Sequence, residues 1–577
     1  MTIHTSIEIA ERSPEVDAMP ASDPTLEAFF SLFYRLRPVT ATFTGVDAHD
    51  HALPDLSPEA LQAAREDMSL MRRRLADAGL GVLHSDELRS RDWRAIDGAL
   101  ADAVLEVQLA EDESLHFARG NPSLAIGEAL FSVIALAGSS TRSPEHRVEA
   151  AVSRMRAFPD YLHGARRTLG EGPVPAAWRD RAIRECDGGL QLLADLAGWP
   201  VAAGAPVTLC RDLMEASTHA AAAVDWFRSY LAGREAADET RYAAGHGLLA
   251  LLLRRGHWCD VPLERLQHEA RAALERETHH FRDALDGEEW SAVAARLAST
   301  HPDSDDVLHA ARAAWQECRV LAAAEVTWPR TALPYEPMPE WARRAAASLY
   351  YLPYRSPAPF GGGVGRYDVQ LPWTTDASAQ EAFARLWNRS VIKLDHVAHH
   401  GALGHHVQNW HAARSVSRIG RVAGVDGACR IAMFGGGTMT EGWACYATEV
   451  MESLGYLTPD ERIAGHHGRV RLMTRAVVDL ELHTGRMSFA DAVRFQVESG
   501  RQSAAQAHAD VTTCSMFPGT AMMSWLGLRD LWRLRSAEEE SRGAAFSSRE
   551  FHDEVLSFGS IPVPLLSKLM ATARVQA

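Results

Sequence analysis

The densest group of residues able to carry out chemistry is a short histidine-rich stretch near residue 400. Five histidines fall within eleven residues of the segment DHVAHHGALGHHVQNW (395–410): His396, His399, His400, His405 and His406. Imidazole is the commonest protein ligand for metals and titrates near neutral pH. The stretch therefore predicts a metal site, a proton-transfer site or both. The alternative is a surface helix that is merely rich in histidine.

The spacing of these histidines departs from the common short zinc motif. In H-E-x-x-H, imidazoles at i and i+4 lie on one face of a helix, with a glutamate as the general base. His396 and His400 have this spacing, but Val397 stands where the glutamate belongs. This pair alone does not form a hydrolase motif.

A second pair, His399 and His405, needs an interrupted helix. Six residues correspond to about 240° around a regular helix, so the two imidazoles would point in different directions. Gly401 and Gly404 lie between them, and glycines permit a break or a bulge. The segment therefore predicts a broken helix if both side chains bind one metal.

Glu441 is a candidate third ligand. It follows the glycine-rich turn 435–437 and begins the segment E-G-W-A-C-Y. A catalytic metal needs two or three protein ligands, an open position for water and a base. By itself, Glu441 would more often be an acid that complements a helix dipole.

Together the two segments resemble a bacterial family, domain of unknown function 885. Its members carry H-E-x-x-P-G-H-H-x-Q followed by E-G-W-A-L-Y, reminiscent of zinc peptidases. Here the segments read H-H-G-A-L-G-H-H-V-Q from His399 and E-G-W-A-C-Y from Glu441. The similarity covers roughly residues 25–540, with further matches at T-G-V-D (44–47), V-D-L-E-L-H (478–483) and F-P-G-T-A (517–521).

The resemblance implies a mainly helical enzyme with one divalent metal ion, zinc first and iron as the alternative. The implied ligands are His399, His405 and Glu441. Residues near the ligands or the substrate would be His396, His406, Gln408 and Tyr446. Asp479 and His483, at i and i+4 of one helix, would join His400 in catalysis by orienting an imidazole and transferring protons.

The departures from the family pattern bear on the reaction. His400 replaces the glutamate that serves as the presumed base, and Leu403 replaces the proline. Thr513, Cys514 and Ser524 stand where an arginine and two tyrosines are expected. Losing general acid–base help costs ~10²–10⁴-fold and losing an oxyanion donor ~10²–10³-fold, so ordinary amide hydrolysis should be impaired.

Three hypotheses follow. The first is a metal-dependent enzyme derived from amide or peptide hydrolysis, with His400 as a base. The second keeps the scaffold for a non-hydrolytic reaction, such as a lyase or cyclase step on a small metabolite; His400 would then be an additional ligand in a nitrogen-rich site that also suits iron or copper. The third is a catalytically dead binding protein, which the retained cluster of costly polar groups disfavours.

The expected architecture is one large, mainly α body around a deep cleft, with at most a small β element. Helix starts are marked by Ser57, Ser143, Thr458 and Ser547, each followed by proline or an acid. Amphipathic patterns predict helices at 216–232, 241–254, 263–285 and 304–327. Residues 1–24 should be a flexible tail, 25–340 an N-terminal helical region and 341–577 the metal-site region, integrated into one domain. A short strand at 366–371 is expected to line the cleft and pair with an extended substrate.

Composition restricts the partners. The net charge of −16 excludes non-specific nucleic-acid binding, which requires a basic surface. Apolar stretches are far shorter than the ~20 residues of a membrane span, and the N-terminus lacks a secretory signal pattern. Seven scattered cysteines without a CxxC pair indicate reduced thiols. We expect a cytoplasmic protein with a small-molecule or peptide-like substrate and no nucleic-acid or membrane partner; the sequence does not determine its oligomeric state.

Overall fold

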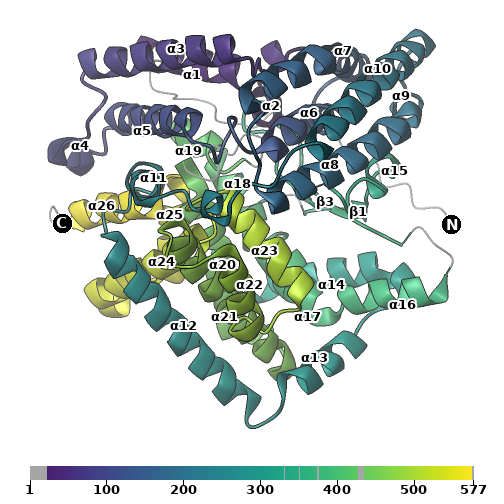
Figure 1. The fold of residues 1–577 in the computed structure, drawn as a ribbon. Coiled ribbons are helices and arrows are strands. Elements are labelled where there is room, and N and C mark those ends of the chain that lie inside the picture. Colours follow the sequence, from purple (N-terminus) through teal and green to yellow (C-terminus); the bar gives the residue numbers. More distant parts are fainter. Residues whose placement is uncertain are drawn as a thin grey trace.

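The protein is built almost entirely of helices. The computed structural model describes residues 23–330, 332–349, 351, 353–372, 376–425 and 435–574. Helices account for 71% of the chain and strands for 2%, which confirms the predicted mainly α class (Figure 1). Residues 1–22, most of the expected N-terminal tail, lie outside the described residues.

The N-terminal helices form the upper part of Figure 1, in purple and blue. Helices α6, α7, α8 and α10 share a hydrophobic core that includes Phe158, Leu192 and Phe227. The helices of this part are α1 (Pro24–Leu36), α2 (Pro38–Thr44), η1 (Asp47–His49), α3 (Pro58–Asp77), α4 (Ser85–Ser90), α5 (Trp93–Glu113), α6 (Pro122–Ala137), α7 (Pro144–Leu169), α8 (Ala176–Asp195), η2 (Leu196–Gly198), α9 (Trp199–Ala202), α10 (Val207–Ala232), η3 (Glu239–Tyr242), α11 (His246–Leu251) and η4 (Leu252–Gly256).

Most of the remaining helices lie in the lower part of Figure 1, in teal, green and yellow. They are α12 (Leu263–Leu285), α13 (Trp290–Ser299), η5 (Ser304–Asp306), α14 (Val307–Leu321), α15 (Glu340–Arg343), α16 (Ala377–Leu386), α17 (Arg389–Val391), η6 (Ile392–His399), α18 (His405–Ala412), α19 (Arg418–Val422), α20 (Gly437–Ser453), α21 (Pro459–His483), α22 (Phe489–Glu498), α23 (Ala504–Met516), α24 (Met523–Arg542), η8 (Gly543–Ala545), α25 (Ser548–Ser557) and α26 (Val563–Arg574). One large hydrophobic cluster extends from Leu26 to Met570, so the regions before and after residue 340 meet in a shared core.

Side-chain caps begin the helices where the sequence predicts them. The hydroxyl oxygens of Ser57, Ser143 and Ser547 accept hydrogen bonds from backbone N–H groups in the first turns of α3, α7 and α25. Thr458 and Glu461 form a reciprocal capping box at the start of α21. These contacts satisfy donors that a helix start leaves without intrahelical partners.

The prediction of one continuous helix at 241–254 is wrong. The chain forms the short 3-10 turn η3, then α11 and the π-helical segment η4. Gly245 lies between them with a φ of 87°, a left-handed conformation that interrupts a right-handed helix. Helix α14 is also shorter than the predicted 304–327 segment.

A small sheet of three strands accompanies the helices. Strand β3 (Arg366–Val369) lies between β1 (Tyr335–Pro337), to which it is parallel, and β2 (Tyr354–Arg355), to which it is antiparallel. The strand predicted at 366–371 is therefore present, but its expected pairing with a substrate is wrong. Both of its edges are already hydrogen-bonded within the sheet.

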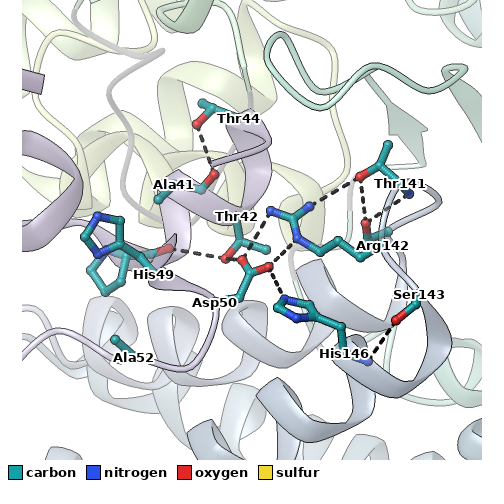
Figure 2. Close-up of polar contacts among 12 residues, drawn as sticks. Ala41, Thr42, Thr44, His49, Asp50, Ala52, Thr141, Arg142, Ser143 and His146 are labelled. Atoms are coloured by element: carbon teal, nitrogen blue, oxygen red, sulfur yellow. Dashed lines mark hydrogen bonds and ion pairs between the residues drawn. The ribbon is translucent and has the colours of Figure 1, made fainter. Parts of the chain in front are cut away.

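A buried carboxylate joins the loop after α2 to helix α7 (Figure 2). Asp50 is fully buried and accepts hydrogen bonds from the hydroxyl of Thr42 at 2.7 Å and the guanidinium of Arg142. The Nε2 atom of His146 lies 2.9 Å from the same carboxylate. Through these contacts, Asp50 holds the loop after α2 against α7 and the residues just before it.

No helix in the described part of the chain is long and apolar enough to cross a membrane. The six cysteines within the described ranges are free thiols, four of them buried. Cys429 lies outside those ranges.

Candidate metal centre

The predicted break in the histidine-rich helix is present. Residues Ile392–His399 form the π-helix η6, and α18 begins at His405 after a turn. The backbone N–H of His400 bonds to the carbonyl of Asp395 at 3.1 Å, a spacing of five residues that is typical of a π-helix. The interruption lets side chains six residues apart face one another.

Both glycines in this turn are required by close packing. A Cβ atom at position 401 would lie 1.8 Å from the hydroxyl oxygen of Tyr335, and one at position 404 would lie 1.8 Å from the carbonyl oxygen of His399. The φ of Gly404 is −71°, so space, rather than a left-handed backbone, demands glycine here.

Two buried indoles hold the carbonyl groups of the turn. Trp315 donates its Nε1–H to the carbonyl of Gly401 at 2.6 Å. Trp443, from the E-G-W-A-C-Y segment, donates to the carbonyl of Leu403 at 2.9 Å. The second sequence motif thus fixes the backbone of the first.

Four side chains converge at this turn. Nitrogen atoms of His399, His400 and His405 all lie within 4.8 Å of one another. Carboxylate oxygens of Glu441, on α20, lie 3.8 Å from Nε2 of His399 and 3.8 Å from Nε2 of His405. We refer to these four residues as the candidate metal centre. It contains the three predicted ligands and also His400.

The imidazoles of the centre are suited to donate lone pairs. Burial, together with the neighbouring imidazoles, holds the pKa values of His399 and His405 well below 6.5, so both rings are neutral at pH 7. Neutral imidazole is the form that binds metals. The side chain of His405 is 5% exposed and that of Glu441 30% exposed, so water reaches the centre from the side of the glutamate.

A hydrogen bond selects the tautomer of His400. Its Nδ1 lies 2.7 Å from the carbonyl oxygen of Asp395, which can only accept. Nδ1 therefore carries the proton, and Nε2 presents its lone pair. This arrangement is typical of histidines that bind metals, and it equally suits a base.

The tyrosine face of the small sheet positions the π-helix. Tyr335 donates its hydroxyl to the carbonyl of His396 at 2.8 Å, and the hydroxyl of Tyr367 lies 2.6 Å from Nδ1 of His396. The ring of Trp387 stacks on His396 with centroids 3.8 Å apart, and Tyr354 stacks on His405 at 6.2 Å. His396, expected near the substrate, is instead clamped among aromatic rings.

The other residues expected around the ligands lie in structural positions. Tyr446 donates its hydroxyl to Nε2 of the buried His552 at 2.7 Å and accepts from Arg535, which joins α20 to α24 and α25. Gln408 donates to the hydroxyl of Ser560 at 2.5 Å, far along the chain. His406 is buried beside the ring of Tyr354. Of these, only His406 lies next to a residue that packs on the centre.

Asp479 and His483, predicted to act in catalysis, are bonded within the fold. Both side chains are fully buried, and Asp479 accepts from the backbone N–H groups of Gly519 and Met522 at 2.9 and 3.0 Å. His483 accepts at Nδ1 from the N–H of Ala244, and its Nε2 lies 3.0 Å from the carbonyl of Cys514. Both ring nitrogens of His483 therefore have partners within the protein. The pair instead joins α21 to neighbouring segments.

Asp395 is a site residue that sequence reasoning missed. It lies one π-helical turn before His400, its side chain is exposed, and no hydrogen bond or ion pair of its carboxylate occurs among the described residues. On a regular helix Asp395 would face His399, four residues later. The π-helical register brings His400 to the same face as well.

Two solved structures share this fold. "A putative lipoprotein of unknown function from Shewanella oneidensis" is 18% identical, with a TM-score of 0.72 over 96% of this chain and 100% of that chain. The "putative lipoprotein from Colwellia psychrerythraea" is 15% identical, with a TM-score of 0.76 over 96% of this chain and 99% of that chain. No curated protein matches the sequence. The family model described as "Bacterial protein of unknown function (DUF885)" matches residues 38–570, and the chain therefore belongs to this family.

Proposed function

We propose that the protein is a metal-dependent enzyme whose single divalent ion is held by His399, His405 and Glu441, with His400 as a fourth ligand. The observation that carries this proposal is the convergence of three imidazoles and one carboxylate around an interrupted helix. Spacings of 3.8 Å between Nε2 and carboxylate oxygens leave room for an ion at ordinary ligand distances of about 2.0–2.2 Å.

The fourth ligand affects the choice of metal. Three ligands and one open position suit zinc in a hydrolase. Three imidazoles and a carboxylate would fill a tetrahedral zinc site, whereas metals that accept five or six ligands would keep open positions for substrate. Iron is therefore the principal alternative to zinc in this proposal.

The bound ion would supply Lewis-acid polarisation or activation of a bound oxygen ligand. The protein's own contribution is positional. Asp395 fixes the His400 ring through its carbonyl, and the indoles of Trp315 and Trp443 hold the turn that carries the imidazoles. Such outer contacts orient ligands and typically alter metal affinity 10–100-fold.

The substitution at position 400 favours a reaction other than simple peptide hydrolysis. A ligating His400 leaves no carboxylate base at that motif position, so ordinary amide turnover should be weak. We therefore favour a transformation of a small or peptide-like metabolite on a peptidase-like scaffold, including lyase or cyclase chemistry. The second candidate is a hydrolase in which His400 is the base, because its Nδ1–H bond leaves Nε2 free to accept a proton.

Metal titration of His400→Ala distinguishes these roles. If His400 is a ligand, the affinity for Zn²⁺ and Fe²⁺, measured by competition with a chromophoric chelator, should fall about 10–100-fold. If His400 is a base, affinity should stay within about threefold of wild type while turnover falls ~10²–10⁴-fold. Unchanged affinity therefore contradicts the four-ligand form of the proposal.

The cellular location is also a proposal. Free and mostly buried cysteines agree with a reducing cytoplasm. The two similar structures are called lipoproteins, a class attached to membranes. We keep the cytoplasm as the proposed location; recovery of the native protein in the membrane fraction of its own cells would contradict it.

A further inference from the structure

We infer that Asp395 is the substrate-recognition carboxylate of the centre and that the substrate carries a protonated amine. This inference rests on the proposed metal-dependent function. It deepens that function by naming a chemical group that the substrate must present beside the metal.

The π-helix places Asp395 on the working side of the centre. Its carbonyl oxygen receives both the backbone N–H and the ring Nδ1–H of His400. In a π-helix, residues four and five positions later lie directly above the first residue, which here are His399 and His400. A regular helix would rotate Asp395 away from one of these two side chains.

The carboxylate has no protein counter-ion at contact distance. Within the parts of the chain that the structure describes, no cationic side chain lies within 4.0 Å of it, and Arg471 is paired with Asp510 at 3.4 Å. No histidine nitrogen within the described residues lies within 4.0 Å of the Asp395 carboxylate either. A charged carboxylate that is left beside a binding site is normally paired by what binds there.

Asp50 shows what a structural carboxylate looks like in this fold. It is fully buried and contacts a guanidinium, an imidazole and a hydroxyl (Figure 2). Asp479 is likewise enclosed and bonded to two backbone N–H groups. Asp395, in contrast, is exposed and has no such partners among the described residues. It nevertheless lies next to the turn that carries His399, His400 and His405.

The chemistry of a carboxylate indicates the group it would bind. A carboxylate can bind an ammonium group through a charge-assisted hydrogen bond.

The test uses hydroxamates, which chelate a metal, with and without an amine. The full chain, loaded in parallel with Zn²⁺ and with Fe²⁺, is titrated calorimetrically with L-leucine hydroxamate and its amine-free analogue 4-methylpentanehydroxamic acid. A longer pair, 6-aminohexanehydroxamic acid and hexanehydroxamic acid, covers a more distant amine. At least one amine-bearing probe should bind wild type about tenfold or more tightly than its amine-free partner.

Variants test whether Asp395 causes the preference for amine-bearing probes. In Asp395→Asn the preference should fall to less than about threefold, while the amine-free probes bind as in wild type and metal content is unchanged. Asp395→Glu should retain part of the preference because it keeps the charge. Equal binding of amine-bearing and amine-free probes by wild type would overturn the inference and leave the metal site intact. Failure of all four hydroxamates to bind either metal form would instead overturn the proposed function itself.

Discussion

The ring of His400 is hydrogen-bonded through Nδ1 to the main-chain carbonyl of Asp395, at 2.7 Å. This bond exists because the helix carrying both residues is of the π type, which places position 400 above position 395. His400 is therefore held with its Nε2 atom available at the centre. The hydrogen bond thus fixes the orientation of the His400 ring.

The variant His400→Glu, which introduces the glutamate that the family resemblance implies, tests what position 400 does. A carboxylate then stands at the position of the proposed base, and hydrolysis of simple peptide amides should rise ~10²–10⁴-fold above wild type. The rate is measured with zinc-loaded protein and a chromogenic peptide amide. Glu441→Gln in the same background should abolish the gained activity. No gain in His400→Glu with metal bound would contradict the idea that the scaffold is peptidase-like.

Filling the space at Gly401 should destabilise the turn. In Gly401→Ala the new methyl would collide with the Tyr335 hydroxyl at 1.8 Å and the His396 carbonyl at 2.6 Å. Overpacking of this kind costs about 1–3 kcal/mol, which urea unfolding would detect. Gly468→Ala, at an exposed helical position with no atom within 4 Å, is the control and should be neutral or stabilising by up to ~1 kcal/mol. Equal stability of the two variants would contradict the packing argument.

The tyrosine clamp on His396 should influence metal binding. Tyr367→Phe removes the hydroxyl that lies 2.6 Å from His396 Nδ1, loosening the π-helix, and should weaken metal affinity several-fold. Tyr351→Phe removes a hydroxyl bonded to the buried Asp368 at 2.9 Å. Both variants should lose about 1–3 kcal/mol of stability, but only Tyr367→Phe should lose metal affinity. Equal losses of affinity would indicate a general effect of stability.

A half-buried glutamate, Glu449, should make stability depend on pH. Burial raises the pKa of Glu449 from 4.5 to about 7, and its carboxylate accepts from Trp532 Nε1 at 2.5 Å. The folded state therefore holds a proton that the unfolded state releases near pH 4.5, so its stabilising contribution is complete below about pH 4.5 and is lost as pH rises through about 7.

Glu449→Gln isolates this contribution because the amide oxygen keeps the bond to Trp532. The free energy of unfolding of wild type minus that of the variant should fall by roughly 1–3 kcal/mol between pH 5 and pH 8, measured by urea unfolding at each pH. Glu540→Gln, at an exposed position on α24, should show no such trend. A difference that rises with pH would contradict the assignment.

The sequence predicts the parts of this fold that depend on local rules. Caps at Ser57 and Thr458 mark helix starts because their side chains satisfy nearby N–H groups. Gly401 and Gly404 predict the helix break, although their physical reason is close packing. Local patterns of this kind do not require knowledge of distant segments.

Tertiary contacts account for what the sequence does not predict. The i,i+4 spacing of Asp479 and His483 looks catalytic, but backbone groups of segments 244 and 514–522 occupy both side chains. The clamp of Tyr335 and Tyr367 on His396 depends on the order of three short strands. The register that exposes Asp395 depends on a π-helix, which no local pattern in the sequence indicates.

The most direct test of the central claim is the metal content of the purified full chain beside Glu441→Ala, His405→Ala and the control Glu540→Gln, by elemental analysis after reconstitution. We predict about one equivalent of zinc or iron in wild type and in the control, and a loss of most of it in the other two variants. Wild type that binds no metal after reconstitution, or variants that keep a full equivalent, would contradict the claim that these residues form a metal centre.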